Sequence, residues 1–290
     1  MEKYTGREIA IFTDIHGLLQ PTIAILEDIK RRGITEIYSL GDNIGVGPSP
    51  SQVLDLLGEY NVNVINGNSE EYSSIGIPPF ASYFSPQKIA SQEWTYSQLT
   101  SDQIKKLNEN KHSYDLDVGG MKIGLCHFAN DVRIDFGRNS TWSYQRSINS
   151  GVEEPQKQFY FTNSESQKEQ IRYFSERGNV EDRGFISAKK DPLFGGKTVD
   201  FYDEIIQGHV HFKMLTEDLK VKIRTIRGAG IGFGPNESID LASYIIIREK
   251  EKGYDVEEIL VPFNRELMIK SINESTMPDK ETITKFTSRR

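Results

Sequence analysis

Short apolar runs alternate with longer amphipathic stretches through the first part of the chain. The apolar runs have the length and composition of buried strands, and they lie at 9–13, 37–40 and 62–65. The stretch between the first two runs places Leu18, Ile23, Leu26 and Ile29 on one face of a helix. A second apolar stripe at helical spacing follows Pro48-Ser49-Pro50. This strand–helix–strand–helix–strand order predicts parallel strands with right-handed crossovers, which is typical of an α/β protein.

After residue 70 the alternation stops, and two polar and aromatic stretches at about 70–112 and 128–163 predict cap-like insertions. The first insertion contains two predicted helices near 86–98 and 101–109. Later strands are predicted as a hairpin through Gly119-Gly120, a run ending at Gln207, and a closing antiparallel section. We expect the tail from Asn273 to be loosely ordered, and we expect 1–290 to form a single domain.

Five apolar runs end directly in side chains that can bind a metal ion. These ends read Asp14-Ile15-His16, Gly41-Asp42, Gly67-Asn68, His127 and Gly208-His209-Val210-His211. Four of the five histidines of the chain lie at these ends. In open α/β sheets, sites form beyond the carboxyl ends of the strands. Seven nitrogen and oxygen donors from five strands therefore predict a two-metal hydrolytic centre.

Each of these motifs is weak by itself, because a histidine or aspartate at a strand end is more often a turn or capping residue. Their joint occurrence, each after its own strand, is what indicates a site. Alternate residues of a strand point to one side, so Asp14 and His16 can bind the same ion. Imidazole, carboxylate and amide donors suit Mn, Fe, Zn or Co better than Ca or Mg. We expect two divalent or trivalent transition-metal ions as cofactors.

Composition narrows the classes of partner. Of the 290 residues, 37% are hydrophobic and 27% are charged, which is typical of a soluble globular protein. A net charge of −7 argues against a nucleic-acid polymer as the partner, although bound metals can still attract a small phosphorylated substrate. The single Cys126 fits a reducing compartment. No secretory signal and no apolar stretch of membrane-spanning length is seen, so we expect a cytoplasmic location and no membrane contact.

The motifs Asp14-Ile15-His16-Gly17, Gly41-Asp42-Asn43, Gly67-Asn68 and Gly208-His209-Val210-His211 are similar to those of a known family. The chain resembles the calcineurin-like metallophosphoesterases, in particular their small bacterial phosphodiesterase branch. The resemblance covers about 8–70, 120–128 and 203–248, and it leaves out the insertions. It implies a four-layer α/β/β/α sandwich of two mixed β-sheets, to which the insertions add a cap.

The resemblance also implies how the donors are shared between two metal ions. One ion would be held by Asp14, His16, Asp42 and His211; the other would be held by Asp42, Asn68, His127 and His209. Asp42 would then bridge the two ions. Asp42, Asn68 and His127 would be the catalytic residues of a phosphoesterase that cleaves phosphodiester or phosphoanhydride bonds by means of a hydroxide between the metals.

The chain departs from the family after the asparagine of the Gly67-Asn68 motif. Many relatives have a histidine there that can protonate the leaving oxygen, but this chain has Ser69 followed by Glu70. A serine hydroxyl is a poor general acid at neutral pH. We therefore expect a preference for leaving groups that need little protonation, such as phosphate anhydrides or aryl esters. Glu70 can act through a water molecule or can have a structural role, and we favour the structural role.

The insertions carry aromatic residues and arginines that can stack on a base and pair with phosphates. We select Arg133 and Arg138 as substrate contacts, while the aromatic residues taken singly are better explained by packing. A nucleotide-like substrate fits this set, for example diadenosine tetraphosphate cleaved to ATP and AMP; a cyclic nucleotide or another phosphodiester stays open. Two other functions also stay open, a phosphoprotein phosphatase and a non-catalytic binding module on the same scaffold. A homo-oligomer is possible as well.

Overall fold

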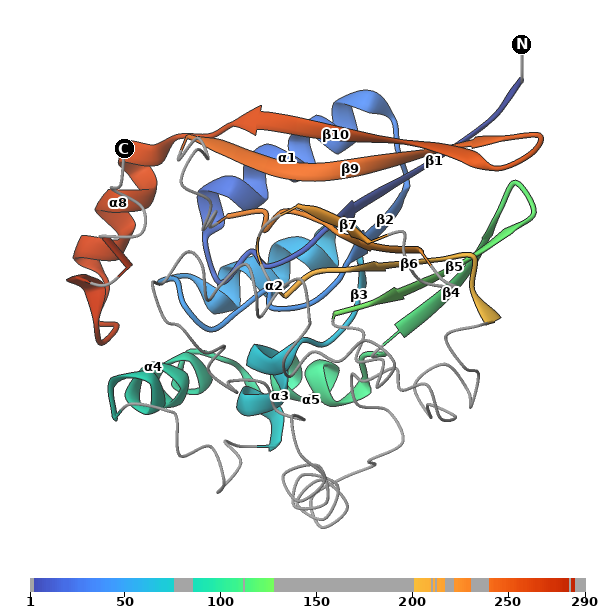
Figure 1. The fold of residues 1–290 in the computed structure, drawn as a ribbon. Helices are drawn as coiled ribbons and strands as arrows, with labels where there is room; N and C mark the ends of the chain where they lie inside the picture. Colours follow the sequence, from blue (N-terminus) through green and yellow to red (C-terminus); the bar gives the residue numbers. More distant parts are fainter. Residues whose placement is uncertain are drawn as a thin grey trace, which may run out of the picture.

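The computed structural model describes residues 3–75, 86–111, 113–127, 201–209, 211, 213–216, 222–230, 240–281 and 283–284. In these residues two five-stranded mixed sheets pack face to face, and helices lie outside them (Figure 1). This arrangement confirms the expected α/β class with two mixed sheets.

The first sheet joins the N-terminal strands to two C-terminal ones. Its order is β10 (Tyr254–Pro262), β9 (Leu241–Lys250), β1 (Tyr4–Phe12), β2 (Glu36–Ser39) and β3 (Asn63–Val64). The strands β1, β2 and β3 are parallel, as the alternating pattern predicts. The long strands β9 and β10 add to β1 as an antiparallel pair. The carboxyl ends of β1, β2 and β3 therefore lie at one edge of the sheet.

The second sheet has the order β4 (Ser113–Val118), β5 (Met121–Cys126), β6 (Glu204–Gln207), β8 (Lys222–Thr225) and β7 (Met214–Thr216). The predicted hairpin joins β4 to β5, and both glycines of its turn have a positive φ, 59° at Gly119 and 78° at Gly120. β5, β6 and β8 are parallel neighbours. The segments that follow β5 and β6 therefore leave the sheet at the same edge.

The side chains of β1 point alternately into two hydrophobic cores, one on each face of the first sheet. Ala10 and Phe12 face the outer core, where α1 (Leu19–Arg32) and α2 (Pro50–Glu59) pack on the first sheet. Ile9 and Ile11 face the inner core between the sheets. The helix α1 ends at Gly33, whose φ of 75° permits the left-handed turn that closes the helix. Both faces of β1 are thus covered, which holds its carboxyl end firmly in place.

Three helices lie near the carboxyl edge (Figure 1): α3 (Asn68–Ile75), α4 (Pro86–Ser97) and α5 (Ser101–Glu109). The last two confirm the helices predicted inside the first insertion. α5 begins with a capping box in which Thr100 accepts from the Gln103 backbone and the Gln103 side chain accepts from the Thr100 backbone. No helix in the described part of the chain is long and apolar enough to cross a membrane.

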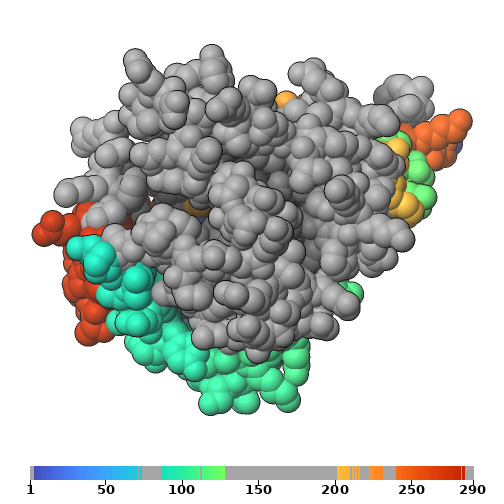
Figure 2. All heavy atoms as spheres, turned by 60° about the horizontal axis from the view of Figure 1, so that its bottom comes forward, coloured from blue at the N-terminus to red at the C-terminus, as the bar shows by residue number. Residues whose placement is uncertain are grey.

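The prediction of a loosely ordered tail from Asn273 was wrong for the residues of that tail that the structure describes, 273–281 and 283–284. The helix α8 (Arg265–Glu274) and the residues after it bury Met268, Ile272, Met277 and Ile283 against Leu18. The Trp94 indole N–H of α4 donates to the Thr276 hydroxyl at 3.2 Å. Figure 2 shows the C-terminal residues beside those of α4 on the surface. The tail from Asn273 looks polar in the sequence because apolar residues in it are few, yet Met277 and Ile283 are buried.

Candidate metal centre

All seven donors chosen from the sequence lie together at the carboxyl edges of the two sheets. Asp14 and His16 follow β1, Asp42 follows β2, and Asn68 begins α3 after β3. In the second sheet His127 follows β5, and both His209 and His211 follow β6. The two sheets face each other, so the seven side chains meet between the ends of the strands. They form two groups.

The first group consists of Asp14, His16 and His211, whose donor atoms all lie within 4.8 Å of one another. The Nε2 atoms of His16 and His211 are 3.0 Å apart, and the two rings are stacked. The Oδ1 atom of Asp14 lies 3.4 Å from His211 Nε2 and 3.8 Å from His16 Nε2. Three donors therefore point to one small space.

The second group consists of Asp42, His127 and His209, again with donor atoms within 4.8 Å of one another. His127 Nε2 lies 3.1 Å from His209 Nδ1. The Asn68 amide lies beside both rings, 3.2 Å from His127 Nε2 and 3.1 Å from His209 Nδ1. Asn68 thus joins this group, as the resemblance implies.

Asp42 connects the two groups. Its Oδ2 atom lies 3.8 Å from His16 Nε2 in the first group and 3.6 Å from His127 Nε2 in the second. The Oδ1 atom accepts the backbone N–H of Ser69 at 2.8 Å. One carboxylate oxygen therefore faces both groups, which is the position that a bridging ligand needs.

The backbone at the candidate ligands has an unusual conformation. Among the described residues other than glycine, seven have a positive φ, and five of those are candidate ligands. They are Asp14 at 55°, His16 at 54°, Asp42 at 52°, His209 at 70° and His211 at 63°. Non-glycine residues rarely adopt this left-handed region, and such strain concentrates at functional sites. This concentration argues against a mere turn or capping role for the five residues.

Backbone carbonyls orient two of the rings. The Nδ1 atom of His127 lies 2.9 Å from the Leu40 carbonyl, and that of His16 lies 3.3 Å from the Ile44 carbonyl. A carbonyl only accepts, so in each neutral ring Nδ1 carries the proton and Nε2 turns a lone pair to the centre. The sequence did not indicate these partners, because a backbone carbonyl has no residue type to recognise.

The electrostatics also suit cations. Burial, with the neighbouring His211, lowers the pKa of His16 to about 4, and burial with His127 lowers that of His209 to about 3. Burial alone would raise the pKa of Asp42, but His127, His16 and His209 hold it at about 2. Burial opposes protonation of His127, but the Asp42 and Asp14 carboxylates raise its pKa. At neutral pH the centre thus offers the ionised Asp42 and the neutral rings of His16 and His209, the protonation states that metal ligands require.

One buried oxygen provides a direct test of whether metal ions fit. Asp14 is fully buried, and its Oδ2 accepts the backbone N–H of His209 at 2.9 Å. Its Oδ1 has no hydrogen-bond donor among the described residues and faces the Nε2 atoms of the His16 and His211 rings. A buried carboxylate oxygen without a donor is costly unless a cation lies beside it. The side chains of the centre therefore fit metal ions.

Glu70 has the structural environment that we favoured from the sequence. Its carboxylate is fully buried and accepts backbone N–H groups of Asp42, Asn43 and Gly67. Burial and the Asp42 carboxylate raise the pKa of Glu70 to about 7, while the backbone donors act in the opposite direction. The substrate contacts proposed at Arg133 and Arg138 lie outside the described residues, as does the whole insertion at 128–163.

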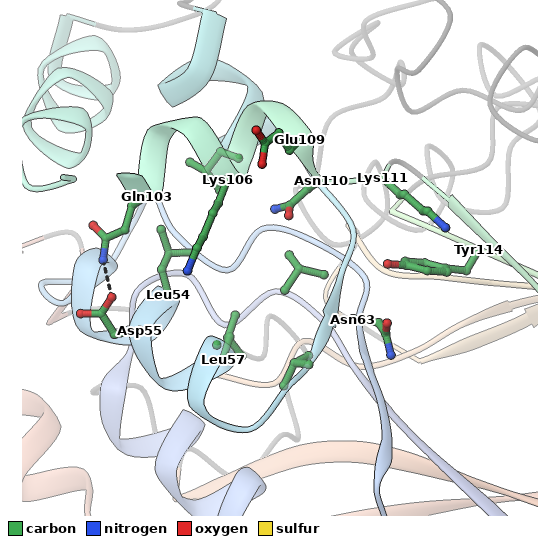
Figure 3. A pocket seen from close by; sticks show the side chains of 14 residues that line it. Leu54, Asp55, Leu57, Asn63, Gln103, Lys106, Glu109, Asn110, Lys111 and Tyr114 are labelled. Atoms are coloured by element: carbon green, nitrogen blue, oxygen red, sulfur yellow. Dashed lines mark hydrogen bonds between the residues drawn. The ribbon is translucent and has the colours of Figure 1, made fainter. Parts of the chain in front are cut away.

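A separate cavity of about 340 Å³ lies between α2, β3, α5 and β4 (Figure 3). Leu54, Leu57 and Leu107 contribute apolar surface to it, while Gln103 donates to Asp55 at 2.8 Å on its polar side. None of the seven candidate ligands lines this cavity. The candidate ligands therefore lie apart from this cavity.

Comparisons with known proteins agree with this geometry. The profile of the calcineurin-like phosphoesterase family matches residues 7–213. An uncharacterized protein of Methanocaldococcus jannaschii is 30% identical over 119 residues, which are 41% of this chain and 48% of that protein. The chain thus spans about half the length of this curated relative.

Two solved structures share the fold over almost the whole chain. A hypothetical protein from Pyrococcus horikoshii OT3 has a TM-score of 0.62 at 14% identity, covering 96% of this chain and 97% of its own. A metallophosphoesterase from Sphaerobacter thermophilus has a TM-score of 0.58 at 15% identity, covering 98% of each chain. The family profile covers more than half of the sequence and includes the candidate ligands from Asp14 to His211. The chain belongs to the calcineurin-like phosphoesterase family.

Proposed function

We propose that this protein is a phosphoesterase with two metal ions that hydrolyses phosphodiester or phosphoanhydride bonds in a small substrate. The observation that carries the proposal is the position of Asp42, whose Oδ2 lies 3.8 Å from His16 Nε2 and 3.6 Å from His127 Nε2. When bound, two transition-metal ions polarise a phosphoryl oxygen and make a water-derived nucleophile available at neutral pH. Mn and Fe suit these donors best in this proposal, with Zn and Co as alternatives.

The residues have separate roles in this proposal. Asp14, His16 and His211 hold one ion, and Asn68, His127 and His209 hold the other, while Asp42 belongs to both sites. The Leu40 and Ile44 carbonyls keep the His127 and His16 rings in the tautomer that binds metal.

Ser69 supports a preference among leaving groups. Its backbone N–H donates to Asp42, and its side chain is 2% exposed and packs close to Gly45. A neutral serine hydroxyl donates a proton poorly, so substrates whose leaving group is already a weak base are favoured. Phosphate anhydrides and aryl esters meet this condition. A dinucleoside polyphosphate such as diadenosine tetraphosphate is the substrate that we propose, with Arg133 and Arg138 as its phosphate contacts.

Metal-dependent turnover tests the proposal. Protein stripped with a chelator and reloaded with Mn²⁺ is assayed on diadenosine tetraphosphate, cyclic AMP, an aryl diester, an alkyl monoester and a phosphopeptide. We expect hydrolysis of the polyphosphate or the aryl diester, and a loss of at least about a hundredfold in Asp42→Asn. The matched control is Asp55→Asn, since Asp55 is exposed and lies at the separate cavity. Faster turnover of the phosphopeptide would favour a phosphoprotein phosphatase, and bound metal without any hydrolysis would favour a binding scaffold.

A further inference from the structure

Glu70 joins two of the loops that carry candidate ligands. Its Oε1 accepts the backbone N–H of Asn43 at 2.6 Å. Its Oε2 accepts the backbone N–H of Asp42 at 2.9 Å and that of Gly67 at 2.8 Å. The first two donors belong to the loop after β2, and the third belongs to the loop after β3. One fully buried carboxylate therefore holds both loops.

These two loops are in direct backbone contact. A Cβ atom added to Gly41 would lie 2.5 Å from Gly67 N, and one added to Gly67 would lie 2.5 Å from Asp42 N. Such distances leave no room for a side chain on either glycine. Backbone N–H groups that are buried at a contact this close need a compact acceptor within the protein. The carboxylate of Glu70 is that acceptor.

The ligands on the two loops are Asp42 and Asn68. Asp42 has a φ of 52°, so its backbone lies in the left-handed region. Its backbone N–H donates to the Glu70 carboxylate. Gly67 directly precedes Asn68, and the backbone N–H of Ser69 also reaches Asp42 Oδ1. A shift of either loop would change the distance between the shared ligand and the second ion. Within the described residues, the loops that carry Asp14, His16 and His211 donate no backbone N–H group to Glu70.

We propose that Glu70 is a positioning residue that fixes Asp42 relative to Asn68 and thereby sets the affinity of the second metal site. This inference rests on the proposed two-metal function. Glutamine at this position keeps the size of the side chain but turns an NH₂ group toward at least one backbone N–H. We expect the loop contact to loosen in that variant while the fold persists.

The test is the stepwise binding of Mn²⁺ to the metal-free full-length protein, followed by calorimetry and by electron paramagnetic resonance. In wild type we expect two bound ions with a spin-coupled spectrum. In Glu70→Gln we expect the second ion to bind at least about tenfold more weakly. The first ion shares Asp42 but keeps Asp14, His16 and His211 in place, so its binding should weaken by a smaller factor. Once one equivalent of Mn²⁺ is bound, further Mn²⁺ should give the spectrum of uncoupled ions. Glu93→Gln, an exposed change on α4, is the matched control.

The spectrum separates positioning from stability. If Glu70→Gln lowers the melting temperature but keeps both affinities and the spin-coupled spectrum, Glu70 is a structural residue only and the inference fails. Glu70→Ala, which removes all three acceptor contacts, should show a larger loss of the second ion if it folds. These readouts need no substrate, so a wild-type protein that binds two ions without hydrolysis would contradict the proposed function and leave this inference standing. Wild type that binds one ion would contradict both.

Discussion

Replacing Ile272 with alanine tests whether the C-terminal helix α8 helps to support the loops that carry the candidate ligands, which we call the metal loops. Ile272 is 0% exposed and packs in a cluster with Leu18, Met268, Met277 and Ile283. Leu18 lies two residues after His16, and Val46, four residues after Asp42, packs against the same cluster. The change removes side-chain volume on α8 without touching any candidate ligand.

The expected loss follows from the burial of the side chain. Isoleucine to alanine removes three carbon groups, each contributing about 0.8 kcal/mol when fully buried, which gives about 2.4 kcal/mol. The cavity left behind adds to this because a packed cluster relaxes only in part, so we expect a loss of about 3–4 kcal/mol in the free energy of unfolding. Leu267→Ala on the same helix is the control, since Leu267 is 47% exposed and should lose less than about 1 kcal/mol.

The assay is urea unfolding of the metal-free protein followed by far-ultraviolet circular dichroism. Both variants should keep the slope of the wild type, so that the change in midpoint reports stability alone. If Ile272→Ala and Leu267→Ala lose similar amounts, the C-terminal segment does not pack against Leu18 in solution. The link between this segment and the metal loops would then be refuted.

Two further predictions concern a buried hydrogen bond and a close contact at a glycine. Tyr244→Phe removes the hydroxyl that donates to the buried Asp28 at 2.6 Å and should cost about 1.5–3 kcal/mol in urea unfolding at pH 7. Burial raises the pKa of Asp28, but the hydrogen bonds from Tyr244 and Arg32 outweigh burial, so the folded pKa lies below the ordinary value. The stabilisation by ionised Asp28 is therefore complete above the unfolded pKa of about 3.9 and disappears as the pH falls through the folded pKa. The variant and wild type should therefore converge in stability in acid, and a constant difference from pH 7 to pH 2 would contradict this. Gly67→Ala should weaken Mn²⁺ binding at least about tenfold because the new Cβ meets Asp42 N. Gly58→Ala, whose Cβ meets nothing within 4 Å, should leave binding unchanged, and equal effects of the two alanines would reject the steric explanation.

The position of the candidate metal centre was predictable because it depends on local patterns and one general rule. Each of Asp14, Asp42 and His127 follows its own apolar run, and parallel strands bring their carboxyl ends to one edge. The sequence does not reveal the left-handed conformation of Asp14, His16 and Asp42, because any residue that ends a strand can leave it in several directions. That conformation depends on contacts between loops, which no local window contains.

The C-terminal segment shows the opposite case. Met277 and Ile283 do not continue the helical spacing of Met268 and Ile272, so the stretch from Asn273 looks like a polar tail. What buries them is Leu18 and Val46, which lie more than 200 residues away in the chain. Burial against a distant element leaves little local signal, and for the same reason the inward side of α8 was not predicted.

Backbone hydrogen bonds between the metal loops offset the conformational strain of the candidate ligands. Past the paired residues of β1 and β2, the backbone N–H groups of Asp14, His16 and Gly17 donate to the carbonyls of Gly41, Asp42 and Asn43 at 2.9, 2.8 and 2.7 Å. The two strands therefore remain paired through the loops that carry three of the ligands. Each left-handed residue costs on the order of 1 kcal/mol or more, which a loop without this pairing would relieve by relaxing. Since β1 is buried on both faces, relaxation of these loops would also disturb both cores. The packing of the two sheets thus fixes the geometry of the candidate ligands, and it holds their side chains together although their backbone is strained.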